Sequence, residues 1–168
     1  VGNDGNRNFE LLIKIAELLP EFEFVFVSKI PEINNSSLKN VNAINGQWHS
    51  KDVTDEDLKK LYSNSRFTIL PLKESTQPSG QSVALQSMSI GIPVLISNTA
   101  GFWDRKNFKD NENIILIEEN TPEYWVKEIK EAYNNLDLLN SISKNSYKLV
   151  NEKFDLINFN QKLLSYLK

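Results

Sequence analysis

Between positions 75 and 97 the sequence reads STQPSGQSVALQSMSIGIPVLIS, which places small polar residues before an apolar helix and a buried strand. Four residues mark the expected start of this helix: Ser79, Gly80, Gln81 and Ser82. The first turn of a helix has free backbone N–H groups and a partial positive charge, which together favour an anion such as a phosphate. Gly80 has no Cβ and would let a ligand approach the backbone closely. The four residues form a candidate phosphate site, although a helix capped by its own hydroxyl groups explains them equally well.

A second polar loop lies at the start of the sequence, where VGNDGNRNF carries Gly2, Gly5 and Arg7. A planar guanidinium suits the geometry of a phosphate, so Arg7 is the best candidate for a cation at such a site. The alternative is a surface charge on the first turn of the following helix. A glycine loop of this kind is expected to follow a strand, of which the sequence shows Val1 alone.

The composition excludes several other kinds of site. With no Cys and one His, His49, among 168 residues, the chain lacks the ligands for a zinc thiolate site, a disulfide, a His-rich metal site or a Ser-His-Asp triad, and no metal is expected. A net charge of -3 and a pI of about 5.3 argue against a nucleic-acid-binding face. No apolar run approaches the roughly 18 residues of a membrane span. The length and the 40% hydrophobic content suit one globular domain over residues 1–168.

Hydrophobic patterns predict helices and strands in alternation. Apolar residues at helical spacing from Phe9 to Leu19 predict a helix that Pro20 ends. Thr54 and Thr121 are expected N-caps, the first followed by three acidic residues and the second by a proline. Short apolar strands are expected at 22–27, 41–44, 67–70, 92–96 and 114–117, and the last helices at about 137–152 and 155–167.

Short, nearly all-apolar strands between helices are typical of a parallel sheet that is covered on both faces. We therefore predict an α/β fold with a doubly wound, Rossmann-like parallel sheet and helices on both faces. Such sheets bind ligands beyond the carboxyl ends of their strands. The glycine loop and the helix start at Gly80 both follow strands, so both should lie at that edge.

Three segments carry a resemblance to a known family. The segment PSGQSVALQSMSIGIPVLIS resembles the nucleotide-sugar-binding part of GT-B glycosyltransferases of the family-four type, also called glycosyl transferases group 1, with Met88, Gly91, Pro93 and Val94 in matching places. VGNDGNRNFELL is similar to the first loop and helix of the C-terminal, donor-binding domain of that family, and LKKLYSNSRFTILPL to a later helix and strand. The similarity covers most of the chain.

The resemblance implies the C-terminal half of a GT-B fold, from a longer protein whose N-terminal acceptor domain is missing here. The substrate would be a nucleotide diphosphate-sugar, and no metal or other cofactor would be needed. The sugar would pass to a glycan or other acceptor in cell-surface polysaccharide synthesis. The place would be the cytoplasm, where the missing part could attach the protein peripherally to the inner membrane. A general base and the acceptor site would lie on the missing domain, so no catalytic residue is assigned, and this chain alone should be inactive.

The site departs from the family pattern in several positions. Where the family has two glutamates eight residues apart, this sequence has Pro78 and Gln86. The resemblance implies that Gln86 contacts the ribose, because its amide keeps an acceptor oxygen without the charge of a glutamate. Pro78 cannot hold the donor sugar, and Glu74 either replaces it from the loop or is a solvated carboxylate. Asn3 stands at the family's arginine position and, with Gly5 and Glu74, forms a candidate donor loop.

Two further loops follow expected strands. In relatives the loop that here carries Trp48 and His49 lies near the base; His49 could contact the base, whereas Trp48 is expected to pack against helices. Thr99 and Gly101 follow the strand that ends at Ser97, and they could face a ligand or form a plain turn.

Two other functions compete with an enzyme. Pro78, Gln86 and Asn3 would also suit a non-catalytic α/β binding module derived from a glycosyltransferase. A phosphoacceptor receiver domain shares the alternating pattern, but no strand-ending Asp lies with an early acidic pair, and this class is excluded.

Overall fold

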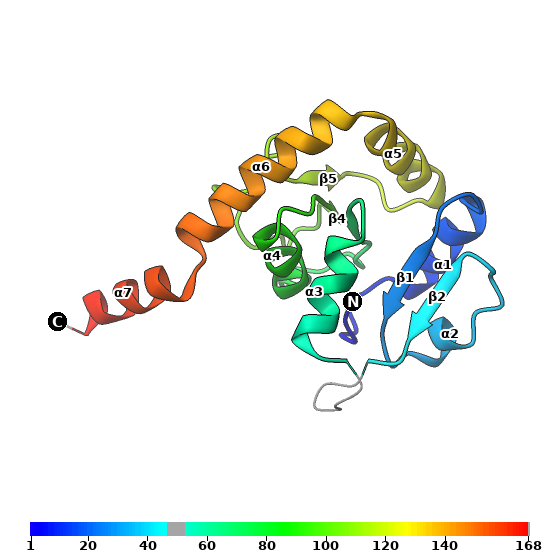
Figure 1. Ribbon diagram of the computed structural model, residues 1–168, viewed down its shortest axis with the longest axis horizontal. Coiled ribbons are helices and arrows are strands. Elements are labelled where there is room, and N and C mark those ends of the chain that lie inside the picture. Colours follow the sequence, from blue (N-terminus) through cyan, green and yellow to red (C-terminus); the bar gives the residue numbers. More distant parts are fainter. Residues whose placement is uncertain (47–52, 168) are drawn as a thin grey trace.

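The computed structural model alternates helices and strands along the chain and describes residues 1–46 and 53–167 (Figure 1). The interpretation of Trp48 and His49 concerns a loop that lies outside these residues. The helices are α1 (Phe9–Leu18), α2 (Pro31–Asn34), α3 (Asp55–Ser63), α4 (Gln81–Ser89), α5 (Pro122–Asn134), α6 (Leu136–Lys153) and α7 (Leu156–Tyr166). The strands are β1 (Phe24–Val27), β2 (Val41–Ile44), β3 (Thr68–Leu70), β4 (Val94–Ser97) and β5 (Ile115–Ile117).

Local sequence signals decide where most helices begin. The side chains of Asn8, Thr54, Thr121, Asn135 and Asp155 each accept a hydrogen bond from a backbone N–H in the first turn of the helix that follows. The two expected threonine caps are therefore confirmed. These bonds replace the intrahelical partners that first-turn N–H groups lack.

One strand is displaced from its expected place. The strand expected at 92–96 runs instead from Val94 to Ser97, because the N–H of Ile92 bonds to the carbonyl oxygen of Ser87 and closes the turn after α4. Pro93 has no N–H, but its carbonyl oxygen accepts from Thr68 and starts the ladder with β3.

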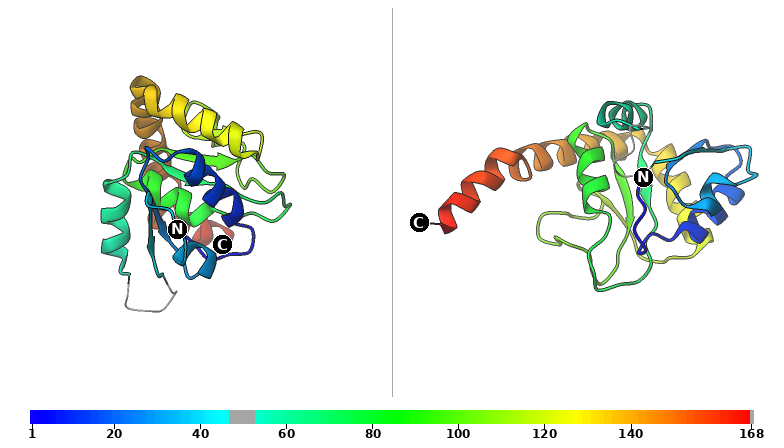
Figure 2. Two further views of the ribbon diagram at one scale, coloured as in Figure 1. Left: turned by 90° about the vertical axis from the view of Figure 1, so that its right-hand side faces the viewer. Right: turned by 90° about the horizontal axis from the view of Figure 1, so that it is seen from below.

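All strand pairs are parallel, which confirms the α/β class, but the strands form two sheets. β1 pairs with β2, and β3, β4 and β5 follow in that order in a second sheet. A cavity of about 420 Å³ separates β1 from β3. The expected single sheet is thus interrupted between these two strands. Figures 1 and 2 show the N-terminal end of the chain at this interruption.

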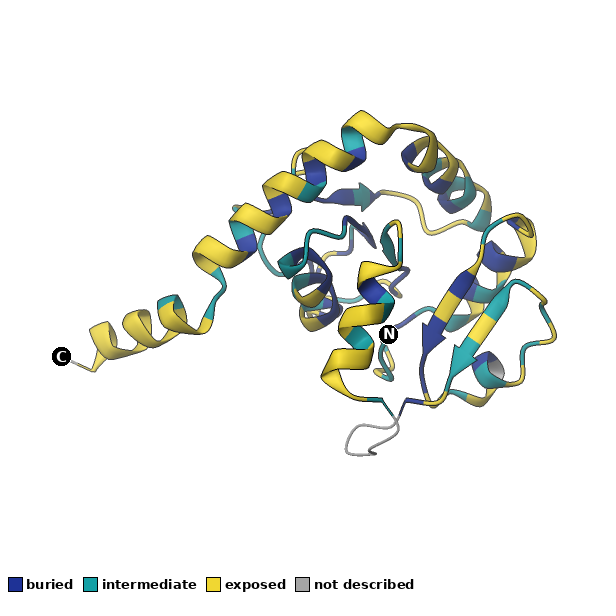
Figure 3. Cartoon of the chain, viewed as in Figure 1, coloured by how far each residue is buried: buried dark blue, intermediate teal, exposed yellow. Residues whose placement is uncertain are grey.

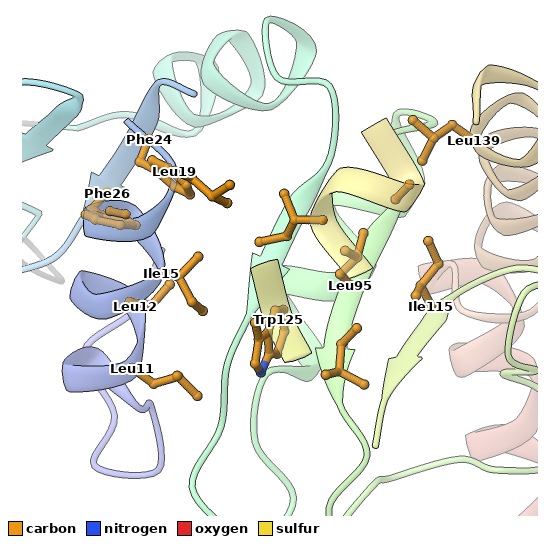
Figure 4. Packing of buried hydrophobic residues seen from close by; sticks show 14 of the residues in the cluster. Leu11, Leu12, Ile15, Leu19, Phe24, Phe26, Leu95, Ile115, Trp125 and Leu139 are labelled. Carbon is orange, nitrogen blue, oxygen red and sulfur yellow. The ribbon is translucent and has the colours of Figure 1, made fainter. Parts of the chain in front are cut away.

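Alternate residues of the central strand point to opposite faces, as the pleat of a strand requires. Leu95 packs in one apolar cluster with Ile115 of β5 and Trp125 of α5 (Figure 4). Val94 and Ile96 belong to a second cluster, which includes residues of α4. Helices therefore cover both faces, as predicted.

The last helix lies apart from this body. α7 buries none of its residues, and Figure 3 shows it as an exposed arm beyond α6. Its exposed apolar side chains, with that of the residue after it, are Leu156, Ile157, Phe159, Leu163, Leu164, Tyr166 and Leu167. None of the described helices has the length and apolar character needed to span a membrane.

We expect removal of residues 155–168 to leave the free energy of unfolding unchanged to within about 0.5 kcal/mol, because the described part of this segment, residues 155–167, contributes no buried side chain. Urea unfolding followed by circular dichroism measures this. A shorter chain that ends at Tyr147 also loses Val150 and Phe154 from the second apolar cluster and should be at least about 2 kcal/mol less stable. An equally large loss from the first truncation would show that α7 packs against the body.

Candidate anion-binding site

The glycine loop, residues 2–8, crosses the carboxyl edges of both sheets. At one end the N–H of Gly2 donates to the carbonyl oxygen of Val27, the last residue of β1, at 3.1 Å. At the other end the N–H of Asn8 donates to the carbonyl oxygen of Pro71, directly after β3, at 3.0 Å. The loop therefore joins the two sheets at the edge where α/β folds bind ligands.

The start of α4 lies beside this loop and has no side-chain cap. Gly80 is the N-cap residue with a φ of 84°, and no side chain among residues 1–46 and 53–167 accepts from the first-turn N–H groups of Gln81, Ser82 and Val83. The hydroxyl of Ser79, which could have capped the helix, points elsewhere and is buried. A self-capped helix, the simpler alternative, is therefore wrong. The amides at this end remain available to an anion.

The guanidinium of Arg7 lies buried between two glycines. Only 5% of Arg7 is exposed, so the alternative of a surface charge is wrong. A Cβ at Gly2 would lie 3.2 Å from Nη2, and a Cβ at Gly80 would lie 3.4 Å from Nη1 and 3.2 Å from Ile96. Both glycines have positive φ, which other residues rarely adopt. The missing side chain of Gly80 thus makes room for Arg7 and the core rather than for a ligand.

One nitrogen of this guanidinium has no partner. Nη1 of Arg7 is buried and makes no hydrogen bond in the described structure. A buried charged donor without an acceptor carries a cost of a few kcal/mol, so such groups need an explanation. An anion at the start of α4 would supply negative charge close to this nitrogen.

Asp4 is a member of the site that the sequence analysis missed. Its Oδ2 accepts from Nε of Arg7 at 2.9 Å, and its Oδ1 accepts from the hydroxyl of Ser79 at 2.9 Å and from the N–H of Asn6 at 3.1 Å. Burial acts to raise the pKa of Asp4, but the charge of Arg7 and these hydrogen bonds together lower it. Asp4 is therefore ionised at neutral pH. The spacing of three residues between Asp4 and Arg7 was the signal available in the sequence.

Arg7, Asp4 and the start of α4 together carry a small positive charge. Arg7 and Asp4 cancel formally, and the start of α4 adds about half a positive charge. Water screens Asp4, whose side chain is 47% exposed, more strongly than it screens the buried Arg7. The arrangement therefore favours an anion through the helix amides, with Arg7 adding charge from behind.

Asn3 and Gly5, both expected in a donor loop, differ from each other: Asn3 is held by hydrogen bonds, and Gly5 lies in open space. Oδ1 of Asn3 accepts from the hydroxyl of Ser28 at 3.0 Å and from the N–H of Lys29 at 2.7 Å, and its Nδ2 donates to the carbonyl oxygen of Gly46 at 2.9 Å. Asn3 thus ties the glycine loop to the segments that follow β1 and β2. Gly5 is exposed, and a Cβ there would have no atom within 4 Å.

Glu74 and Gly101 connect two loops at the same edge. Oε1 of Glu74 accepts from the N–H of Ala100 at 2.9 Å. A Cβ at Gly101 would lie 2.6 Å from the carbonyl oxygen of Gln77, so the two chain segments touch there. Thr99 is buried within this turn. Glu74 is therefore exposed but bonded, and one of its oxygens supports the loop before α4.

Gln86 lies further along α4 and faces α3. It follows Gln81 by five residues, about 7.5 Å along a helix. Its Oε1 lies 3.5 Å from the hydroxyl of Tyr62, at the limit of a hydrogen bond. Burial, opposed by the charge of Arg7, raises the pKa of Tyr62 to about 12. A groove of about 210 Å³ here is lined by Asp55, Leu58, Lys59, Tyr62, Gln86, Ser89 and Ile90. The structure thus brings Arg7, Ser79 and Gly80 together and leaves Gln86 on another side of α4.

Metal ligands do not gather in residues 1–46 and 53–167: no three His, Cys, Asp or Glu side chains there are placed to hold an ion.

This geometry defines a general class of protein: an α/β domain with parallel strands and an uncapped helix start at the carboxyl edge of the sheet. Residues 4–149 match the model of the family described as "Glycosyl transferases group 1". The chain belongs to this family. A search of curated protein sequences gave no match.

Solved structures show the same fold. The chain is similar to a glycosyltransferase from Rickettsia africae ESF-5, with a TM-score of 0.77 and 17% identity over 97% of this chain and 44% of that one. It is also similar to Anabaena Alr3699/HepE in complex with UDP and glucose, with a TM-score of 0.74 and 17% identity over 98% of this chain and 45% of that one. The chain therefore spans less than half of these two proteins.

A third match covers nearly the whole of both chains. The C-terminal domain of the group 1 family protein LpcC from Francisella tularensis has a TM-score of 0.68 and 17% identity, and the similarity spans 93% of this chain and 84% of that one. The fold is thus that of the C-terminal half of a GT-B glycosyltransferase, as the resemblance implied.

A substitution at Gly101 tests whether the loop after β4 touches the loop before α4. We expect Gly101→Ala to cost about 1–3 kcal/mol of unfolding free energy and to shift the amide resonances of residues 74–80, because its methyl group would overlap Gln77. Gly5→Ala is the matched control and should change neither, since the space beside Gly5 is open. Equal effects of the two substitutions would contradict this contact.

Proposed function

We propose that this chain is the donor-binding domain of a glycosyltransferase and that it binds the diphosphate of a nucleotide diphosphate-sugar at the start of α4. The observation that carries the proposal is the pairing of uncapped first-turn amides with a buried guanidinium whose Nη1 lacks a partner. Neither feature alone indicates a ligand, because helix ends are common and buried arginines can be structural. Together they place donors and positive charge at the edge where this fold binds ligands.

The residues take roles according to their positions. Amides of Gln81 and Ser82 would bind phosphate oxygens, with Ser79 and Gly80 fixing the turn before them. Arg7 would supply positive charge behind the amides. Gln86, about 7.5 Å further along the helix, would turn from Tyr62 to accept from a ribose hydroxyl. Glu74 would have one oxygen free for the donor sugar.

The chemistry follows from the charge that develops when the glycosidic bond to the diphosphate breaks. The leaving diphosphate becomes more negative, and preorganised amides and a fixed cation stabilise that charge more than they stabilise the bound donor. The amides and the guanidinium supply the positive potential themselves, so this stabilisation does not depend on a metal ion. The group that activates the acceptor would come from a separate N-terminal domain, so this chain alone should not turn over.

The exposed apolar side chains of α7 support a contact with such a domain, since a helix with many exposed apolar residues marks an interaction surface. The solved relatives extend well beyond this chain, and one of them is described in complex with UDP and glucose. By family resemblance we assign the acceptor to glycans of cell-surface polysaccharide synthesis, and the reaction to the cytoplasm.

A non-catalytic binding module remains the second candidate. Asp4 offsets the charge of Arg7, and Asn3 is bonded to the segments after β1 and β2. Pro78 has no carboxylate to accept hydrogen bonds where the family has a glutamate. Such a module would bind a nucleotide, but the protein that contains it would not transfer a sugar.

A nucleotide titration tests the proposed binding. We expect UDP or GDP to produce saturable amide shifts at residues 79–83 in NMR spectra of the chain. Arg7→Gln should weaken this binding about tenfold or more, because a charged group close to the diphosphate is lost. Arg66→Gln is the control for charge, since Arg66 precedes β3 at the opposite end of the sheet and bonds to the carbonyl oxygen of Tyr133. Absence of saturable shifts, or equal effects of the two substitutions, would contradict the proposal.

Removal of the offsetting carboxylate tests the charge balance. We expect Asp4→Asn to strengthen binding of inorganic pyrophosphate about three- to tenfold at low salt, because the amide retains an acceptor for Ser79 while the negative charge is lost. The gain should shrink as salt is added. Asp137→Asn, at the start of α6, is the control and should have no effect. Weaker binding by Asp4→Asn would contradict this prediction and would mean that the ion pair of Asp4 with Arg7 supports anion binding.

A further inference from the structure

Leu72 lies between the glycine loop and the end of β4, and it is held from both sides. It follows β3 by two residues and is paired with Arg7 in an isolated antiparallel bridge. Two backbone hydrogen bonds flank this pair, from Asn8 N–H to the Pro71 carbonyl oxygen at 3.0 Å and from Lys73 N–H to the Asn6 carbonyl oxygen at 2.8 Å. The glycine loop therefore pairs with residues 71–73 like a short antiparallel strand.

The backbone groups of Leu72 itself point away from the glycine loop. In an antiparallel ladder, two residues whose neighbours exchange the hydrogen bonds direct their own N–H and C=O groups to the outer sides. The ladder between β3 and β4 stops at Leu70 and Ile96, and the N–H of Asn98 donates to Ile117 of β5. Leu72 is buried, so its N–H and C=O groups need partners other than the backbone of β4.

Two side chains supply these partners. Oγ of Ser97, the last residue of β4, accepts from the N–H of Leu72 at 2.9 Å and donates to Oδ1 of Asn120 at 2.6 Å. Nδ2 of Asn120 donates to the carbonyl oxygen of Leu72 at 2.8 Å, which closes a circuit of three hydrogen bonds. Trp125 sets the orientation of the Asn120 amide, because its indole Nε1 can only donate and lies 3.2 Å from Oδ1.

The hydrogen bond between Ser97 and Leu72 is the buried part of this circuit. Ser97 is 1% exposed and Leu72 is 2% exposed, whereas Asn120 is an exposed residue. Water can therefore replace Asn120 at the Leu72 carbonyl oxygen more easily than it can replace Ser97 at the N–H. A buried N–H that loses its acceptor is costly, which favours a shift of the segment that carries it. Such a shift would move the residues paired with Leu72.

We propose that Ser97 is a positioning residue for the anion site: its hydroxyl fixes Leu72, and the segment around Leu72 fixes Arg7 behind Gly80. Arg7 carries the contact to the start of α4, since a Cβ at Gly80 would lie 3.4 Å from its Nη1. The effect of Ser97 on nucleotide binding rests on the proposed function. Its effect on the position of Arg7 does not, and it can be measured without a ligand.

A second buried serine provides the matched control for a hydroxyl that is merely structural. Oγ of Ser87 lies 2.9 Å from Oγ1 of Thr68 and donates to the carbonyl oxygen of Ile92 at 3.1 Å. Ser87 is fully buried, as Ser97 nearly is, but it lies at the amino ends of β3 and β4. Loss of either hydroxyl should destabilise the fold, whereas the glycine loop should respond to the loss at Ser97.

Amide exchange and the Arg7 side-chain signal test the positioning. We expect Ser97→Ala to speed exchange at Asn8 and Lys73 about tenfold or more and to shift the Nε–H resonance of Arg7, which reports the bond to Asp4. Ser97→Thr keeps the hydroxyl and should restore both signals. Exchange is compared with that at Phe24, whose amide bonds to the β2 side and reports a general loss of stability.

Two further variants complete this comparison. Ser87→Ala should leave the exchange at Asn8 and Lys73, relative to Phe24, unchanged. Asn120→Ala leaves the bond from Leu72 to Ser97 in place and should speed exchange about threefold, so it provides the test if Ser97→Ala does not fold. Equal effects of Ser97→Ala and Ser87→Ala, or of Ser97→Ala and Ser97→Thr, would overturn the proposal. Unchanged exchange in the folded Ser97 and Asn120 variants would also overturn it.

Titration with UDP separates this proposal from the proposed function. We expect Ser97→Ala to weaken UDP binding about fivefold or more, and Ser87→Ala to remain within about twofold of the native chain. If the native chain does not bind UDP, the proposed function fails, whereas faster exchange in Ser97→Ala would still support the positioning of Arg7. Saturable binding by the native chain that Ser97→Ala leaves unchanged would overturn the role of Ser97 at the anion site.

Discussion

Burial of the guanidinium of Arg7 is the constraint on which the arrangement of the site depends. A charge that is withdrawn from water must be compensated, and Asp4 compensates it through a 2.9 Å ion pair while Nη1 is left without a partner. The guanidinium fits because Gly2 and Gly80 both lack side chains and adopt positive φ. One side chain thus holds the glycine loop against the start of α4.

This contact joins elements that are far apart in the sequence. Asp4 bonds to Arg7 within the loop and to Ser79 across to the helix, which sets the loop and the first turn of α4 in one geometry. The loop is in turn attached to Val27 at the end of β1 and to Pro71 after β3. An edge connected by such hydrogen bonds holds the backbone amides in place, so that a bound diphosphate would not have to order them.

Sequence patterns predicted those features that depend on neighbouring residues. Thr54 and Thr121 cap helices because capping is a local hydrogen bond. The start of α4 near Gly80 was expected from the small polar residues there, but it begins without a side-chain cap from the described residues. The split of the sheet was not predictable in this way, because the pairing of strands depends on contacts between residues that are far apart in the sequence. The burial of Arg7 and its pairing with Asp4 likewise depend on how loop and helix pack together.

A crystal structure of the chain with UDP tests the central claim most directly. The account predicts that diphosphate oxygens lie within hydrogen-bond distance of the N–H groups of Gln81 and Ser82, with the guanidinium of Arg7 still packed behind Gly80. A diphosphate bound away from α4, or a bound state in which the guanidinium has moved away from Gly80, would contradict it.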